Sequence, residues 1–177
     1  MGTFNQQVAI RHVASNGHVA ALSMGTITYT CSIGPAGITY SKSEGDGATP
    51  AGRWPMRYVM YRADRVARPI TGLPVERIHP DTGWCDDPAS RDYNKSIQLP
   101  YAHSHEKLWR NDHVYDMIVV LGHNDNPAVP GKGSAVFMHL SRPDGSPTRG
   151  CIALRPNHLR QVLLRSGIGT VVRIGQM

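Results

Sequence analysis

Glycine and proline interrupt this sequence so often that few stretches are left for long helices. The 177 residues include 18 glycines and 13 prolines, more than average usage, and both residue types favour turns over helix interiors. Short strands tolerate such interruption. We therefore expect a mainly β fold, a sandwich or a barrel, with one or two short helices. The chain is long enough to bury a core, and one domain over residues 1–177 is the simplest organisation.

Alternating apolar and polar residues predict where several strands lie. The segment QVAIRHVASNGHVAAL alternates on both sides of Asn16 and Gly17, a dipeptide that favours hairpin turns. Segments beginning at Arg53, Val114 and Ser134 predict three further strands. The sequence therefore predicts an N-terminal hairpin followed by strands separated by loops.

One segment near the C-terminus has the pattern of a helix. Leu159, Val162 and Leu163 recur at helical spacing in RPNHLRQVLLRSG, and Gly167 supplies a stop. The segment GTVVRIG after it predicts a closing strand.

The stretch from Ala63 to Arg110 follows neither period and is rich in proline and polar residues. Loops of that length in compact domains are usually lids, binding loops or disordered segments. Its aromatic residues argue against disorder, so we expect a long ordered loop. Trp84, Tyr93 and Asn94 are candidates for a wall over a binding site, although the same side chains could simply hold the loop in place.

The net charge of +6 narrows the choice of partners. The arginines are scattered along the chain, and no aromatic-rich nucleic-acid motif accompanies them. We therefore expect no nucleic-acid partner. The basic charge is typical either of a solvated surface or of a protein that binds a carboxylate-bearing substrate. No segment is apolar for long enough to predict a transmembrane span.

The three cysteines, Cys31, Cys85 and Cys151, do not form a metal-binding pattern. They are far apart, with no C-x-x-C or C-x-x-H pair, so we expect no metal. Their odd number leaves at least one thiol outside any intrachain disulfide. Cys31 lies in a predicted strand and is expected in the core. Acidic neighbours should keep Cys85 unreactive, because nearby negative charge raises the pKa of a thiol.

The segment TRGCIAL makes Cys151 a candidate nucleophile. A catalytic cysteine needs a neighbouring base or cation to form its thiolate. His139, twelve residues earlier at the end of an apolar segment, is the candidate base. Gly150 lacks a side chain and would let a carbonyl approach the backbone N–H donors of an oxyanion site. The alternative is a buried structural thiol, which is common for free cysteine.

Several segments, in the right order, resemble the L,D-transpeptidase (YkuD-like) catalytic domain family. GSAVFMHLSRPDGSPTRGCIAL resembles the family's catalytic segment, a histidine followed later by Ser/Thr-His-Gly-Cys, and EGDGATPAGRW resembles its glycine-rich turn. GWCDDPASRDYN, LGHNDNP and PGKGSA resemble a short branch of the family. The likeness extends from about Ile33 to Ile174.

This resemblance implies a β-rich enzyme that acts on peptidoglycan stem peptides without a metal or an organic cofactor. It implies Cys151 as the nucleophile and His139 as the general base. Thr148 and Gly150 fall at the family's Ser/Thr and Gly positions, so we expect Gly150 to belong to the catalytic group and Thr148 to contact the substrate.

Two positions depart from the family pattern. The histidine two residues before the cysteine is Arg149, and an arginine common two residues after it is Ala153. Arginine cannot act as a base at neutral pH, but it can stabilise a thiolate or bind a carboxylate. We expect Arg149 to bind substrate and to influence which stem position serves as the acyl donor. His123 and Arg142 are further candidates for the same cleft, with a turn histidine and a solvated arginine as the alternatives.

The implied reaction starts with attack of the thiolate on the third stem residue and release of the terminal D-alanine. An amine of a second stem would resolve the thioester to a crosslink, whereas water would make the protein a carboxypeptidase. A non-catalytic cell-wall binding module is the third interpretation. Because family members are commonly acylated by carbapenems, a covalent carbapenem adduct is expected. The substrate implies the bacterial envelope or periplasm, but the N-terminal residues show no signal peptide, which leaves a cytoplasmic location open.

Overall fold

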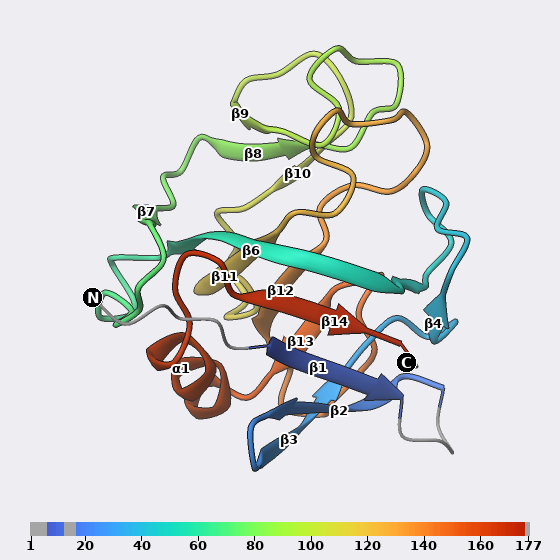
Figure 1. Cartoon of the computed structure of the whole chain (residues 1–177). Helices are drawn as coiled ribbons and strands as arrows, with labels where there is room; N and C mark the ends of the chain where they lie inside the picture. The colour runs from blue at the N-terminus through green and yellow to red at the C-terminus, as the bar shows by residue number, and fades with distance from the viewer. Residues whose placement is uncertain (1–6, 13–16, 176–177) are drawn as a thin grey trace.

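The computed structural model describes residues 7–12 and 17–175, and this part of the chain is mainly β with a single helix (Figure 1). The elements in chain order are β1 (Gln7–His12), β2 (Val19–Met24), β3 (Ile27–Ser32), β4 (Ile38–Thr39), β5 (Thr49–Pro50), β6 (Gly52–Tyr61), β7 (Val75–Arg77), β8 (Thr82–Cys85), β9 (Ser96–Gln98), β10 (His105–Lys107), β11 (Met117–Leu121), β12 (Phe137–Leu140), β13 (Ile152–Leu154), α1 (Pro156–Leu164) and β14 (Val171–Ile174).

Most of the strands belong to one sheet that closes on itself. Its order is β11-β12-β13-β3-β2-β1-β14-β6-β7, and β6 also pairs with β11, with Val59 opposite Val119. The sheet is therefore a barrel, one of the two forms that the composition predicted. β1 and β2 form the expected antiparallel hairpin. Gly17 in its turn has a φ of 58°, whereas Asn16 lies outside the described residues.

Alternate positions of the strands fill the barrel interior. On β12 and β13, Met138 and Ile152 are partners in the ladder, and both are fully buried in the main apolar cluster with Ile10 and Leu22 of the N-terminal hairpin. Since successive side chains of a strand point to opposite faces, the residues between these inward positions face the outside of the barrel. That outer face carries the candidate nucleophile and base.

The helix α1 joins the same interior cluster. Leu159, Val162 and Leu163 are fully buried, which confirms the helix predicted from their spacing. Pro156 stands in the first turn, where its missing N–H costs no hydrogen bond. No helix in the described ranges is long and apolar enough to cross a membrane.

A second, smaller sheet covers the outer face of the barrel. β8 pairs antiparallel with β9 and β10, and Figure 1 shows these strands above the barrel. Trp84 of β8 packs its ring edge to face with Phe137 of β12, with the centroids 5.0 Å apart. We expected a long loop here, and this was wrong in part. Strands of three or four residues are too short to show a period, and packing on the barrel fixes their pairing.

β12 begins later than predicted, and the reason lies next to the candidate site. The expected strand started at Ser134, but β12 starts at Phe137. Ala135 has a φ of 50°, a left-handed conformation that costs a non-glycine residue free energy and breaks the strand. Its N–H donates to Asn94 Oδ1 at 3.0 Å, so a side chain of the covering segment holds the turn.

Candidate active site

Cys151 and His139 lie on the outer face of two neighbouring strands. β12 and β13 are parallel, with His139 opposite Ala153. Cys151, immediately before β13, continues this ladder opposite Phe137, whose N–H donates to Cys151 Sγ at 3.4 Å. Phe137 and His139 share a face because they are two residues apart. The fold therefore brings the predicted nucleophile and base to one face, one diagonal step apart, although no hydrogen bond joins them among the described residues.

The Cys151 thiol is held in its protonated form. It is buried, with 8% of its surface exposed, and Sγ donates to the carbonyl of Ala135 at 3.1 Å. Burial raises the pKa of this thiol to about 12, with a further contribution from the negative charge of Glu106. The Phe137 N–H and the positive charge of Lys42 act in the opposite direction. At neutral pH the candidate nucleophile is therefore a neutral thiol.

His139 has the tautomer that a general base needs. Nδ1 lies 3.0 Å from the carbonyl oxygen of Leu140. A carbonyl can only accept, so Nδ1 carries the proton and Nε2 keeps its lone pair. Burial lowers the pKa of His139 to about 4, and the positive charges of Arg142 and Arg110 contribute to the same shift. The ring packs edge to face with Tyr115, with the centroids 5.3 Å apart. His139 is therefore a neutral, positioned acceptor at neutral pH.

A tight turn sets the position of Cys151. Thr148 Oγ1 donates to the carbonyl of Cys151 at 2.7 Å and accepts the N–H of Gly150 at 3.1 Å. Gly150 has a φ of 125°, and a Cβ there would stand 2.7 Å from the carbonyl oxygen of Ala48. Only glycine fits this close approach of the glycine-rich turn. The N–H of Gly150, which we expected to face an oxyanion, is occupied by Thr148 in this conformation.

Lys42, from the same glycine-rich segment, also approaches this turn. Its Nζ lies 3.4 Å from the point where a Cβ of Gly150 would stand. The side chain is 9% exposed and forms an ion pair with Asp46. Lys42 could not be predicted as a site residue from the sequence, because nothing in the local pattern shows that this loop folds against the cysteine.

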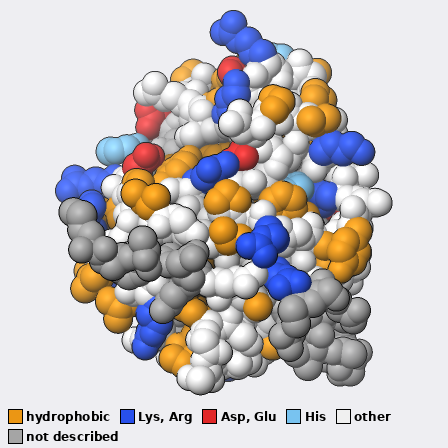
Figure 2. Space-filling view, viewed as in Figure 1, with side chains coloured by type: hydrophobic (Ala, Val, Ile, Leu, Met, Phe, Trp, Pro, Cys, Tyr) orange, Lys and Arg blue, Asp and Glu red, His pale blue; other side chains and the backbone are white. Residues whose placement is uncertain are grey.

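Charged side chains surround the site without forming one uniform patch. Arg149 is exposed and close enough to Glu106 to act on its charge. Glu106 accepts a hydrogen bond from Tyr115 Oη at 2.7 Å, and burial raises the pKa of its carboxyl. Arg142 lies 3.8 Å from a carboxylate oxygen of Asp112. Over the rest of the surface, Figure 2 shows Lys and Arg scattered across the face in view, as the sequence indicated.

Two of the predicted wall residues, Trp84 and Asn94, are hydrogen-bonded to each other, and Asn94 is also bonded to the turn at Ala135. Asn94 Oδ1 accepts from Trp84 Nε1 and from the N–H of Ala135, each at 3.0 Å. Its Nδ2 donates to the carbonyl of His123 at 3.0 Å and to that of Asn124 at 2.8 Å. The amide is therefore fully occupied by the protein.

Tyr93 and His123, two further predicted site residues, each have one polar atom bonded to the protein. Tyr93 Oη donates to Glu44. His123 Nε2 lies 3.0 Å from the carbonyl oxygen of Lys132, whereas its Nδ1 is buried without a hydrogen-bond partner among the residues that the structure describes. The geometry shows how these side chains hold the loops around the cysteine, and their contact with substrate stays a prediction.

Comparison with known proteins shows which family the chain belongs to. Residues 12–174 match the L,D-transpeptidase catalytic domain, YkuD. The chain belongs to the YkuD family. Among solved structures it is similar to L,D-transpeptidase 1 of Mycobacterium tuberculosis, at 13% identity and a TM-score of 0.40, over 97% of this chain and 62% of that one. The chain thus spans less than two thirds of that protein. No curated protein sequence matches.

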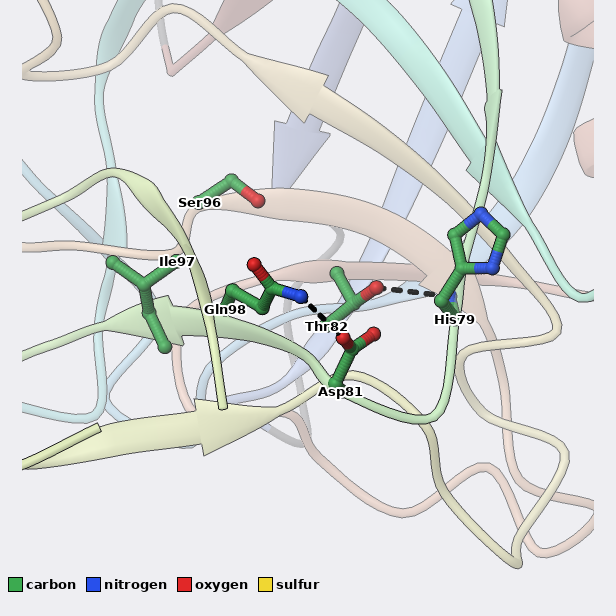
Figure 3. Close-up of a pocket in the computed structure, with 6 residues that line it drawn as sticks. All are labelled: His79, Asp81, Thr82, Ser96, Ile97 and Gln98. Atoms are coloured by element: carbon green, nitrogen blue, oxygen red, sulfur yellow. Dashed lines mark hydrogen bonds between the residues drawn. The ribbon is translucent and has the colours of Figure 1, made fainter. Parts of the chain in front are cut away.

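The YkuD domain also has a surface hollow that is separate from the cysteine. It has a volume of about 430 Å³ and lies between the turn before β8 and the strand β9 (Figure 3). Its wall is tied by a 2.7 Å hydrogen bond from Gln98 to Asp81 and by one from the His79 N–H to Thr82. None of the residues around Cys151 lines it, so the hollow is a feature of the covering sheet and not of the candidate active site.

Proposed function

We propose that this YkuD domain is a peptidoglycan L,D-transpeptidase with Cys151 as nucleophile and His139 as general base. The observation that carries the proposal is their shared position on the outer face of two neighbouring parallel strands, with the proton of His139 on Nδ1 and the lone pair therefore on Nε2. Family membership supports a peptidoglycan peptide as substrate. With such a substrate, the reaction would take place in the bacterial cell envelope. The protein would then contribute to cell-wall organisation.

In the proposed reaction, His139 Nε2 takes the proton of Cys151 Sγ. The thiolate attacks the carbonyl carbon of the third stem residue, the bond from this carbon to the D-alanine nitrogen breaks, and the imidazolium returns the proton to that nitrogen. The amine nitrogen of a second stem then attacks the carbonyl carbon of the thioester and gives a proton to His139. The bond from this carbon to Sγ breaks, and the imidazolium returns the proton to Sγ, which leaves a new amide bond and a free thiol. Since Sγ–H points at the Ala135 carbonyl, the first step requires this hydrogen bond to break.

Arg149 is the side chain we propose for binding a stem carboxylate. It is exposed beside the cysteine, and the structure records no ion pair for it within residues 7–12 and 17–175. Arg142, in contrast, already lies near Asp112. A guanidinium binds a carboxylate through two parallel hydrogen bonds. This arrangement supports Arg149 as the residue that selects which stem peptide enters.

The test compares the protein with its Cys151→Ala variant on purified tetrapeptide stems. Crosslinked dimers should form with the wild type and not with Cys151→Ala, whereas Cys85→Ala, which changes a fully buried thiol, should retain crosslinking. Release of D-alanine without dimers, even with added amine, would indicate a carboxypeptidase instead.

A carbapenem provides a second assay of the same cysteine. The wild-type protein should gain the mass of the drug on Cys151, and Cys151→Ala should not. Binding to intact sacculi that is equal in both proteins, with no adduct and no crosslink, would indicate a binding module and contradict the proposal.

A further inference from the structure

Two glycines make room for Lys42 beside the cysteine. A Cβ at Gly133 would stand 2.9 Å from Cγ and 3.0 Å from Cε of Lys42, and a Cβ at Gly150 would stand 3.4 Å from Nζ. Both glycines have positive φ angles, of 95° and 125°. The lysine side chain therefore runs past Gly133 and ends at Gly150, the residue that precedes Cys151.

The ammonium of Lys42 is only partly satisfied by the protein. Its side chain is 9% exposed, and within the described part of the chain one hydrogen bond is recorded for Nζ, to Asp46. Asp46 also accepts the backbone N–H groups of Ser43 and Ala48, each at 2.9 Å. An ammonium has three donors, so donors remain for a further acceptor. A largely buried cation costs free energy unless negative charge lies near it. Negative charge that forms at Cys151 during a reaction would in turn be stabilised by a nearby cation.

One backbone donor that we expected at the oxyanion is already occupied in the turn at Cys151. Acyl transfer forms a thiolate and then a tetrahedral oxyanion, both negatively charged. The N–H of Gly150 is taken by Thr148 Oγ1 at 3.1 Å, so it does not point freely at an oxyanion. Lys42 Nζ reaches the same turn.

We propose that Lys42 stabilises the negative charge that forms at Cys151, first on the thiolate and then on the oxyanion. For the oxyanion, this inference rests on the proposed function, because only acyl transfer forms an oxyanion. For the thiolate, it needs only the Cys151 thiol and no particular substrate. A purely structural role, in which the pair with Asp46 only holds the glycine-rich turn, makes a different prediction. It would lower thermal stability when lysine is replaced, but it would leave the reactivity of a folded Cys151 unchanged.

The first experiment measures alkylation of Cys151 by iodoacetamide, with the site located by peptide mass mapping. Lys42→Gln keeps a donor for Asp46 and removes the charge, and Lys42→Met removes both. At about pH 7 both variants should be alkylated at least about threefold more slowly than wild type, because loss of the cation raises the thiol pKa and lowers the thiolate fraction. Lys42→Arg should stay within about twofold of wild type, and so should Lys107→Met, which removes an exposed lysine.

Thermal melting and circular dichroism establish that each variant is folded. Wild-type alkylation rates in folded Lys42→Gln and Lys42→Met would overturn the inference, and so would an equal slowing in Lys42→Arg. The result does not depend on peptidoglycan chemistry, because iodoacetamide needs only the thiolate.

A carbapenem then tests the oxyanion. Acylation should fall further than alkylation in Lys42→Gln, by about tenfold or more, because alkylation forms no oxyanion. An equal fall in both reactions would limit Lys42 to the thiolate and overturn the oxyanion part. If the wild type were alkylated with the expected Lys42 dependence but never acylated, the proposed function would fail while the thiolate part of the inference stood.

Discussion

Replacing His139 should remove a specific part of the protein's sensitivity to acid. His139 is 5% exposed, and burial lowers its pKa to about 4 from an ordinary value of 6.5. Between these values the unfolded chain binds a proton that the folded protein excludes. The free energy of unfolding therefore falls as the pH falls through this window. His139→Gln has no proton to bind, so it lacks this contribution.

The size of the effect follows from the two pKa values. With 6.5 in the unfolded chain and about 4 in the folded protein, protonation costs the wild type about 2 kcal/mol of unfolding free energy between about pH 7 and about pH 5. The total reaches about 3 kcal/mol once both states are protonated. All other titrating groups are common to the two proteins and cancel in the difference.

Urea denaturation at a series of pH values measures this difference directly. The unfolding free energy of wild type minus that of His139→Gln should decrease by about 2 kcal/mol over the stated window. His139→Leu should give the same pH dependence, whatever its stability at neutral pH. A difference that stays constant with pH would show that His139 is not held neutral by burial. The proposed role of Nε2 as the base, which needs a neutral ring, would then be contradicted.

Three further substitutions test how the site is held and what it binds. Gly150→Ala should lower the unfolding free energy by about 2 kcal/mol or more and abolish crosslinking, since its Cβ would stand 2.7 Å from the carbonyl oxygen of Ala48; unchanged thermal melting would contradict the close approach. Asn94→Ala should cost about 3 kcal/mol in denaturation, because it leaves the N–H of Ala135 and other buried groups unpaired. Arg149→Gln should raise KM for a free stem carboxylate about tenfold but not for the amidated stem, and equal KM changes would refute carboxylate binding.

The elements that could be predicted from the sequence have a clear local pattern. The helix followed from Leu159, Val162 and Leu163, whose spacing matches the face they bury. The N-terminal hairpin followed from alternation. The three short strands of the covering sheet could not be found in this way, because their pairing depends on contacts such as Trp84 against Phe137.

In the candidate site, too, some residues could be predicted from local sequence patterns and others could not. Cys151 and His139 lie at the ends of apolar segments that pair as neighbouring strands, so their proximity could be predicted from the sequence and the family resemblance. Lys42 and Glu106 come from distant loops and strands, and only the fold brings them to the cysteine. The left-handed turn at Ala135 was also unpredictable, because the side chain that holds it belongs to the covering segment.

Intact-mass spectrometry of the protein after brief reaction with a purified tetrapeptide stem tests most directly whether Cys151 is the nucleophile. We expect a protein adduct with the mass of the stem minus D-alanine, located on Cys151 by peptide mapping and absent from Cys151→Ala. We also expect that an added stem amine discharges the adduct as a crosslinked product. D-Alanine release or crosslinking by Cys151→Ala at the wild-type rate would contradict the account, and so would a stem adduct on another residue.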